Sequence, residues 1–113
     1  MKYIIAVIQP DRLDEVLRLL EDEEIHLVTV TQVMGRGRQK GIAEVYRSHV
    51  EGGRLLRKVK LEVAVNEQFV QSTIDAIVKG GRTGKIGDGK IFVLDLKEVI
   101  RVRTGETGTV AIG

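Results

Sequence analysis

Residues 59–65 read VKLEVAV, and their apolar side chains alternate with charged or small ones. A period of two residues is typical of a β-strand that buries one face, and we expect this strand to end at Asn66. Beyond it, apolar residues recur at helical spacing over 69–78. Gly80 and Gly81 follow, and because glycine tolerates positive φ we expect the helix to end there.

Four further segments complete the pattern. Downstream, KIFVLDL (90–96) predicts a strand. Upstream, YIIAVI (3–8) is an apolar run typical of a strand buried on both faces, and Pro10 ends it because proline cannot donate to a sheet. Residues 11–21 carry apolar side chains three and four apart, which predicts an amphipathic helix. IHLVTVTQVMG (25–35) is rich in β-branched residues and predicts another strand.

The resulting order, βαββαβ, predicts an α+β fold of the ferredoxin-like type. A chain of 113 residues buries roughly 65% of its unfolded surface, so we expect residues 1–113 to form a single domain. The connection 36–58 is long for two neighbouring strands, since hairpin loops usually hold two to five residues. It carries seven basic and two acidic residues, a net charge of +5. A connection of this length is typical of a functional segment.

Composition excludes several classes of function. Eighteen Lys and Arg against 16 Asp and Glu leave a net charge of +2, too close to neutral for a nonspecific nucleic-acid binder. There is no cysteine, and two histidines are too few to indicate a zinc cluster. The apolar run near the N-terminus is too short for a signal peptide or a bilayer span. We expect a cytoplasmic protein without membrane insertion and without a nucleic-acid partner.

Residues 83–90, TGKIGDGK, combine glycines with two lysines. Gly84, Gly87 and Gly89 let backbone N–H groups approach anionic oxygens, and the lysines supply countercharge. The spacing differs from the P-loop pattern of NTPases, and a strand rather than a helix is expected to follow. The segment therefore indicates either a phosphate-binding turn or a plain glycine-rich turn.

Arg101 and Arg103 lie two residues apart near the C-terminus. In an extended segment both guanidinium groups project from one face, which suits bidentate contacts with phosphate oxygens. The alternative is a solvated strand edge.

Several stretches resemble the P-II nitrogen-regulatory signal proteins. They are GRGRQKG (35–41), EVYR (44–47), KVKLEV (58–63), TGKIGDGKIFV (83–93) and VIRVRTGE (99–106), in the order and spacing of that family. The similarity extends over essentially the whole chain. It implies a homotrimer with a nucleotide site in each cleft between subunits, where ATP and ADP compete and 2-oxoglutarate joins Mg-ATP.

The resemblance also implies roles for individual residues. Gln39 would help to coordinate Mg²⁺ and to bind 2-oxoglutarate, and Lys58 would pair with a carboxylate of 2-oxoglutarate. An amide oxygen and an ammonium suit those two tasks. The implied nucleotide contacts are Thr29, Gly35, Gly37, Arg38, Gln39, Glu62, Ala64, Gly87, Asp88, Gly89, Lys90, Arg101 and Arg103.

The resemblance places the contacts with regulated partner proteins in the long connection. Tyr46 and Arg47 would contact a regulated partner, such as an ammonium transporter, another transporter or a metabolic enzyme. Many bacterial members carry a modifiable tyrosine where this chain has Glu51, and some carry a phosphorylatable serine where it has His49. We therefore expect regulation by ligands without modification of the loop apex.

Two other classes of function share parts of the pattern. An ATP-utilising enzyme would need a positioned base or nucleophile, whereas the acid in the glycine-rich turn, Asp88, is explained by turn formation. An RNA-binding module of the same βαββαβ order would need aromatic side chains on its strands for base stacking. The strands predicted over 59–65 and 90–96 offer only Phe92. A sensing regulator that is not an enzyme is the expected function.

Overall fold

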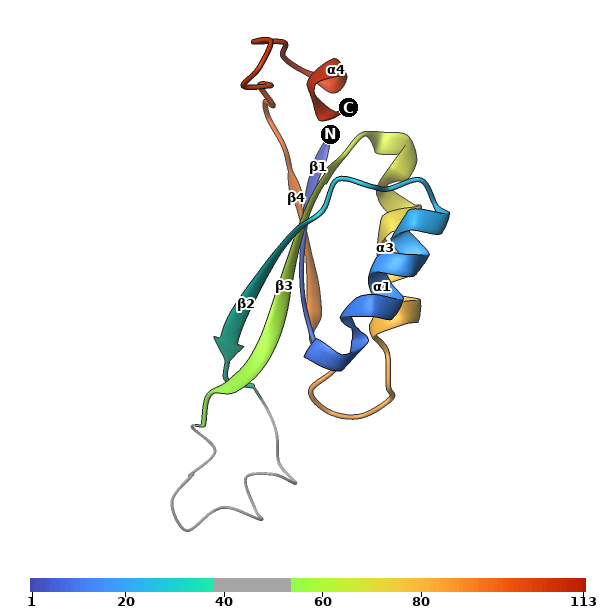
Figure 1. The fold of residues 1–113 in the computed structure, drawn as a ribbon, viewed down its shortest axis with the longest axis vertical. Helices are drawn as coiled ribbons and strands as arrows, with labels where there is room; N and C mark the ends of the chain where they lie inside the picture. Colours follow the sequence, from blue (N-terminus) through green and yellow to red (C-terminus); the bar gives the residue numbers. More distant parts are fainter. Residues whose placement is uncertain (38–53) are drawn as a thin grey trace.

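The computed structural model describes residues 1–37 and 54–113 and confirms the βαββαβ order (Figure 1). None of the helices in these residues is long and apolar enough to cross a bilayer. The strands are β1 (Lys2–Ile8), β2 (Thr29–Gly35), β3 (Leu56–Val65) and β4 (Lys90–Asp95). The helices are α1 (Leu13–Asp22), α3 (Val70–Gly81) and a short C-terminal α4 (Thr109–Ile112), with 3-10 turns at Pro10–Arg12 and Glu67–Phe69.

The four strands form one antiparallel sheet in the order β2-β3-β1-β4. β3 and β1 lie in the centre, and β2 and β4 form the edges. The helices α1 and α3 lie side by side and cover one face of the sheet (Figure 1). This is the ferredoxin-like arrangement expected from the sequence.

The core lies between this sheet face and the two helices. The alternation in 59–65 is confirmed, because every second residue of β3 from Val59 to Val65 is buried. β1 was expected to be buried on both faces, but in the single chain only one of its faces is buried. The opposite face of the sheet carries no helix, so Tyr3, Ile5 and Val7 stay partly exposed. The buried side chains that meet are Ile4, Ala6, Ile8, Val16, Leu20, Ile25, Val59, Leu61, Val63, Val65, Ala76 and Ile77.

The strand expected from Ile25 begins four residues later, at Thr29. The reason is the cap of α1, in which Glu24 takes a positive φ of 63°. The N–H of Ile25 donates to Leu20 O over 2.9 Å and that of Glu24 donates to Glu21 O over 2.9 Å, the pair of bonds of a Schellman motif. Ile25 is therefore a buried part of the helix end. β2 and β3 form a hairpin, and β3 begins at Leu56, earlier than the strand expected from Val59. The connection between the two strands is therefore 36–55 and not 36–58.

The helix was expected to end at Gly80 and Gly81, and α3 does end at Gly81. The positive φ expected there is wrong, because neither glycine has one. A Cβ on Gly80 would lie 2.9 Å from Val16 Cα, closer than packed atoms approach. The glycine is required because α3 presses against the backbone of α1.

Candidate functional site

The glycine-rich segment forms a tight turn between α3 and β4. Gly84, Gly87 and Gly89 all have positive φ, at 89°, 105° and 100°, which explains the three glycines. The carboxylate of Asp88 accepts hydrogen bonds from the backbone N–H groups of Thr83 and Gly84, each at 2.8 Å, and from the Thr83 hydroxyl. The bond from that hydroxyl and those from the backbone lower the pKa of Asp88. The Asp88 carboxylate thus holds the start of the turn, at Thr83 and Gly84, close to its end.

Gly89 fixes the turn against β1. A Cβ at this position would lie only 1.7 Å from the carbonyl oxygen of Val7. No side chain fits there, so the turn passes directly over the end of the central strand. The sequence indicated a need for glycine in this turn, and the contact with Val7 shows why it is strict at Gly89.

A hollow of about 440 Å³ lies between this turn and the base of the β2–β3 hairpin. Seven of the predicted ligand-binding residues line it, although they come from three separate parts of the chain. The lining residues are Val7, Gly35, Arg36, Gly37, Lys58, Lys85, Ile86, Gly87, Asp88, Gly89 and Lys90. The structure therefore brings together four of the glycines, Asp88 and all three lysines, Lys58, Lys85 and Lys90, for which the sequence indicated phosphate or carboxylate binding.

The charge of this hollow suits an anion. Of the described residues that line it, Arg36, Lys58, Lys85 and Lys90 are cationic and Asp88 is the single acid. The oxygens of Asp88 accept the hydrogen bonds of the turn, and its single negative charge offsets only one of the four cations. Within residues 1–37 and 54–113, no group of three His, Asp or Glu side chains could hold a metal ion. The hollow is therefore suited to phosphate or carboxylate groups.

Lys58 lies within β3 rather than at the close of a loop, and it is only 8% exposed. Its ammonium donates a hydrogen bond of 2.8 Å to the carbonyl of Gly87. Burial lowers the pKa of Lys58, and the nearby Asp88 opposes that shift. A partly desolvated cation in a hollow is a strong partner for a ligand carboxylate.

Gln9 is a residue of this region that the sequence did not indicate. It follows the last residue of β1, and its side-chain amide donates to the same Gly87 carbonyl over 2.8 Å. A glutamine at a strand end carries no pattern of its own. Only the path of the turn over β1 reveals its role.

A second group of predicted residues lies on the sheet face that the helices leave uncovered. Thr29 on the edge strand β2 pairs with Glu62 on β3, and Ala64 lies opposite Tyr3 on β1. The Tyr3 hydroxyl donates to the Glu62 carboxylate, and this bond raises the pKa of Tyr3. Thr29 thus lies on an edge of the sheet and not on one of its two central strands. These residues share the face of Lys58 but do not line the hollow.

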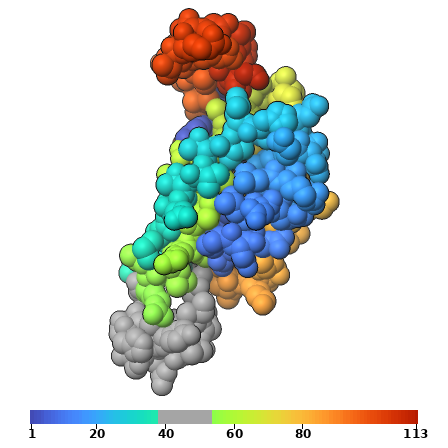
Figure 2. Space-filling model, in the orientation of Figure 1, coloured from blue at the N-terminus to red at the C-terminus, as the bar shows by residue number. Residues whose placement is uncertain are grey.

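The two C-terminal arginines were expected in an extended segment, and this is wrong. Residues 101–106 form a turn in which the N–H of Gly105 donates to Arg101 O over 2.7 Å. The guanidinium of Arg101 bonds to Glu106 at 2.8 Å and to Val110 O at 3.0 Å, while Arg103 is exposed. This turn lies at the opposite end of the molecule from the glycine-rich turn (Figures 1 and 2).

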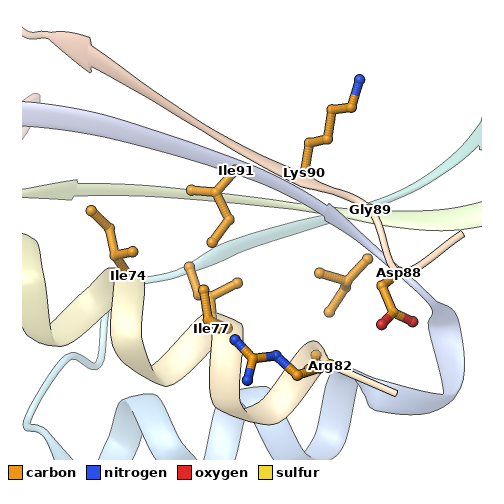
Figure 3. A pocket seen from close by; sticks show the side chains of 10 residues that line it. Ile74, Ile77, Arg82, Asp88, Gly89, Lys90 and Ile91 are labelled. Atoms are coloured by element: carbon orange, nitrogen blue, oxygen red, sulfur yellow. The ribbon is translucent and has the colours of Figure 1, made fainter. Parts of the chain in front are cut away.

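A second hollow, of about 420 Å³, lies on the helix side of the glycine-rich turn. Its wall includes Ile74 and Ile77 of α3 and Ile91 of β4, with Arg82 at the end of the helix. In Figure 3 the side chain of Lys90 points away from these isoleucines, to the other side of β4. The turn thus separates an apolar hollow from the cationic one.

Comparison with known proteins decides the family. The family model described as "Nitrogen regulatory protein P-II" matches residues 1–106. The chain belongs to the P-II family. It is 52% identical over 114 residues to nitrogen regulatory protein GlnK1 of Methanosarcina mazei, covering 99% of this chain and 97% of the relative. It is 48% identical over 112 residues to nitrogen regulatory protein P-II 1 of Escherichia coli, covering 99% and 100%.

A solved P-II structure agrees with the fold. The crystal structure of Arabidopsis thaliana PII bound to citrate matches with a TM-score of 0.79 and 39% sequence identity, and the match covers 97% of this chain and 87% of that chain. The resemblance noted in the sequence is confirmed. This P-II protein is a signal-transduction regulator of the nitrogen-regulatory type.

Some predicted contacts of this P-II protein lie outside the described residues. They are Arg38, Gln39, Tyr46 and Arg47, together with the apex positions His49 and Glu51. The assignments of Gln39 to Mg²⁺ and to 2-oxoglutarate, and of Tyr46 and Arg47 to a partner, stay predictions.

Proposed function

We propose that this P-II protein senses ATP and ADP, binds 2-oxoglutarate together with Mg-ATP, and reports the result to a partner through the connection 36–55. The observation that carries the proposal is the cationic hollow beside the glycine-rich turn. Its glycines allow backbone N–H groups to approach phosphates, and Lys90 and Lys85 supply charge. Lys58 is the partner for a carboxylate, and the P-II structure solved with citrate supports a carboxylate ligand for the family.

The site is completed by a second copy of the chain. The C-terminal segment that carries Arg101 and Arg103 lies at the opposite end of the molecule from the glycine-rich turn (Figure 1), so we expect the two segments to meet one ligand only between subunits. The uncovered sheet face supports assembly, since Phe92 and Leu94 are 49% and 46% exposed and pair with Ile5 and Tyr3 on that face. Apolar surface of this kind is typical of an interface. A homotrimer, with one nucleotide between each pair of subunits, is the assembly we propose.

The described residues fit magnesium only as part of the nucleotide. The hollow is lined by cations, and Asp88 is occupied by the turn, so the protein offers no carboxylate cage there. Magnesium would be held by phosphate oxygens and by Gln39, where it could also receive 2-oxoglutarate. In this arrangement Lys58 and the backbone of the turn orient the anions.

In this proposal the protein acts on its partner through the connection 36–55 and not by catalysing a reaction. Fixing the backbone of about 20 residues costs on the order of 20 kcal/mol, whereas allosteric coupling is typically about 1–3 kcal/mol, so a small ligand is not expected to set the conformation of a whole connection of this length. We propose that the ligand acts at the base of the connection, near Gly37 and Lys58, and that the partner contacts the remainder. The proposed partners are an ammonium transporter, another transporter or a metabolic enzyme.

Calorimetry tests this proposal. ATP, ADP and AMP are titrated with and without Mg²⁺ and 2-oxoglutarate, and native mass spectrometry counts subunits and bound ligands. We expect three nucleotides per trimer and 2-oxoglutarate binding only with Mg-ATP. Nucleotide binding at full affinity to a monomer, or equal 2-oxoglutarate binding to the ADP form, would contradict it.

A further inference from the structure

The carbonyl of Gly87 accepts two side-chain hydrogen bonds from different strands. Gln9, at the end of β1, donates through Nε2 at 2.8 Å. Lys58, in β3, donates through Nζ at 2.8 Å. Both bonds are partly buried. A carbonyl oxygen has two lone pairs, so the two donors use its full capacity.

The two donors differ in their access to a ligand. Lys58 lines the cationic hollow, whereas Gln9 does not. The backbone of Gln9 is fixed, because it precedes Pro10 and its own carbonyl accepts the N–H of Arg12 at 3.1 Å. Since only Lys58 faces the hollow, it is the donor that an anion there would draw away from Gly87, whereas Gln9 lies outside the hollow and can keep its bond.

We propose that Gln9 is a positioning residue that holds the glycine-rich turn in place when Lys58 leaves the Gly87 carbonyl for an anionic ligand. The ligand part of this inference rests on the proposed function, with a carboxylate of 2-oxoglutarate as the anion. A partly buried carbonyl that loses its only donor is costly. With Gln9 present, the Gly87 carbonyl keeps one hydrogen bond after Lys58 turns to the ligand. The ligand therefore gains its contact with the Lys58 ammonium at a lower cost in free energy.

A test without ligand uses Gln9→Met, Lys58→Met and the double variant. Methionine has nearly the size of either side chain but has no N–H donor. Gln68→Met is the matched control, since Gln68 is exposed and lies near Met1 and Thr109, away from the turn. The ¹³C shift of the Gly87 carbonyl reports its hydrogen bonds. Amide hydrogen exchange at Thr83 and Gly84, which bond to Asp88, reports the order of the turn.

Each single variant should shift the Gly87 carbonyl but change exchange at Thr83 and Gly84 by less than about threefold, because one donor remains. The double variant should accelerate exchange more than about tenfold. The control should change neither signal. Exchange in the double variant that equals the product of the two single effects would overturn the inference, since the donors would then act independently.

A second test uses the ligand. Gln9→Met should leave Mg-ATP affinity within about threefold of the unaltered protein and weaken 2-oxoglutarate binding about tenfold. Equal losses for both ligands would show a general structural role, and unchanged 2-oxoglutarate binding would show no role; either overturns the inference. If the unaltered protein binds no 2-oxoglutarate, the proposed function fails on that ligand, and the exchange test still decides the role of Gln9.

Discussion

The glycine-rich turn and the C-terminal turn both carry residues assigned to the nucleotide, yet they are held in different ways. Residues 83–89 are tied to the rest of their subunit through Val7, Gln9 and Lys58. Residues 101–106 are closed mainly by their own contacts, with the Glu106 carboxylate accepting from Arg101 and from Thr104 at 2.8 Å each. One turn is shaped by the sheet beneath it, and the other is a self-contained unit at the end of the chain. The comparison separates substitutions that affect folding from those that affect binding.

The largest expected effect comes from glycine. Gly89→Ala should lower the free energy of unfolding by about 3 kcal/mol, because the new Cβ meets the Val7 carbonyl and the φ is positive. Gly105→Ala is the matched change in the C-terminal turn, where φ is 74° but nothing lies within 4 Å, and it should cost about 1 kcal/mol. Urea unfolding measures both. Equal losses would remove the distinction between the two turns.

The next effect concerns ligand affinity. Arg103→Ala and Lys90→Ala should each weaken ATP binding by about 2 kcal/mol, through a lost charge-assisted contact, while the midpoint of urea unfolding changes little. Calorimetry gives the affinities.

Mixing these two variants sharpens the comparison. If the turns of neighbouring subunits face one nucleotide, mixed trimers of Arg103→Ala and Lys90→Ala chains contain some intact sites. Full-affinity binding should then reappear at a fraction of the sites after mixing and subunit exchange. Mixed trimers, verified by native mass spectrometry, that bind no better than either variant would place both residues in the same subunit's site.

The smallest effect is on pH dependence. The pKa of Asp88 is lowered in the fold, so its carboxylate stabilises the turn above the ordinary carboxyl pKa, and this stabilisation is lost as the pH falls through the lowered value. On acidification, amide exchange at Thr83 and Gly84 should accelerate relative to the intrinsic rate, with a midpoint below the range of unperturbed aspartates. Asp88→Asn should remove this pH step. A step that persists in Asp88→Asn would assign it to another group.

The sequence by itself determined the order of elements, the alternation in β3, the glycine requirement of residues 84–89 and the family. These features were predictable because side-chain periodicity is a local property of the chain and because several glycines close together indicate a backbone that no side chain may obstruct. It also placed Gly35, Gly37, Lys58 and the glycine-rich turn in one binding function, through the resemblance.

Only the tertiary structure decided which distant groups meet. Ile25 belongs to a helix cap because of bonds back to α1, and Gly80 is required by the backbone of Val16. Arg101 bonds to Glu106 because its segment turns back on itself. Gln9 reaches the Gly87 carbonyl 78 positions away only because the turn crosses the end of β1. Such contacts follow from the packing of whole elements, which no local pattern in the chain encodes.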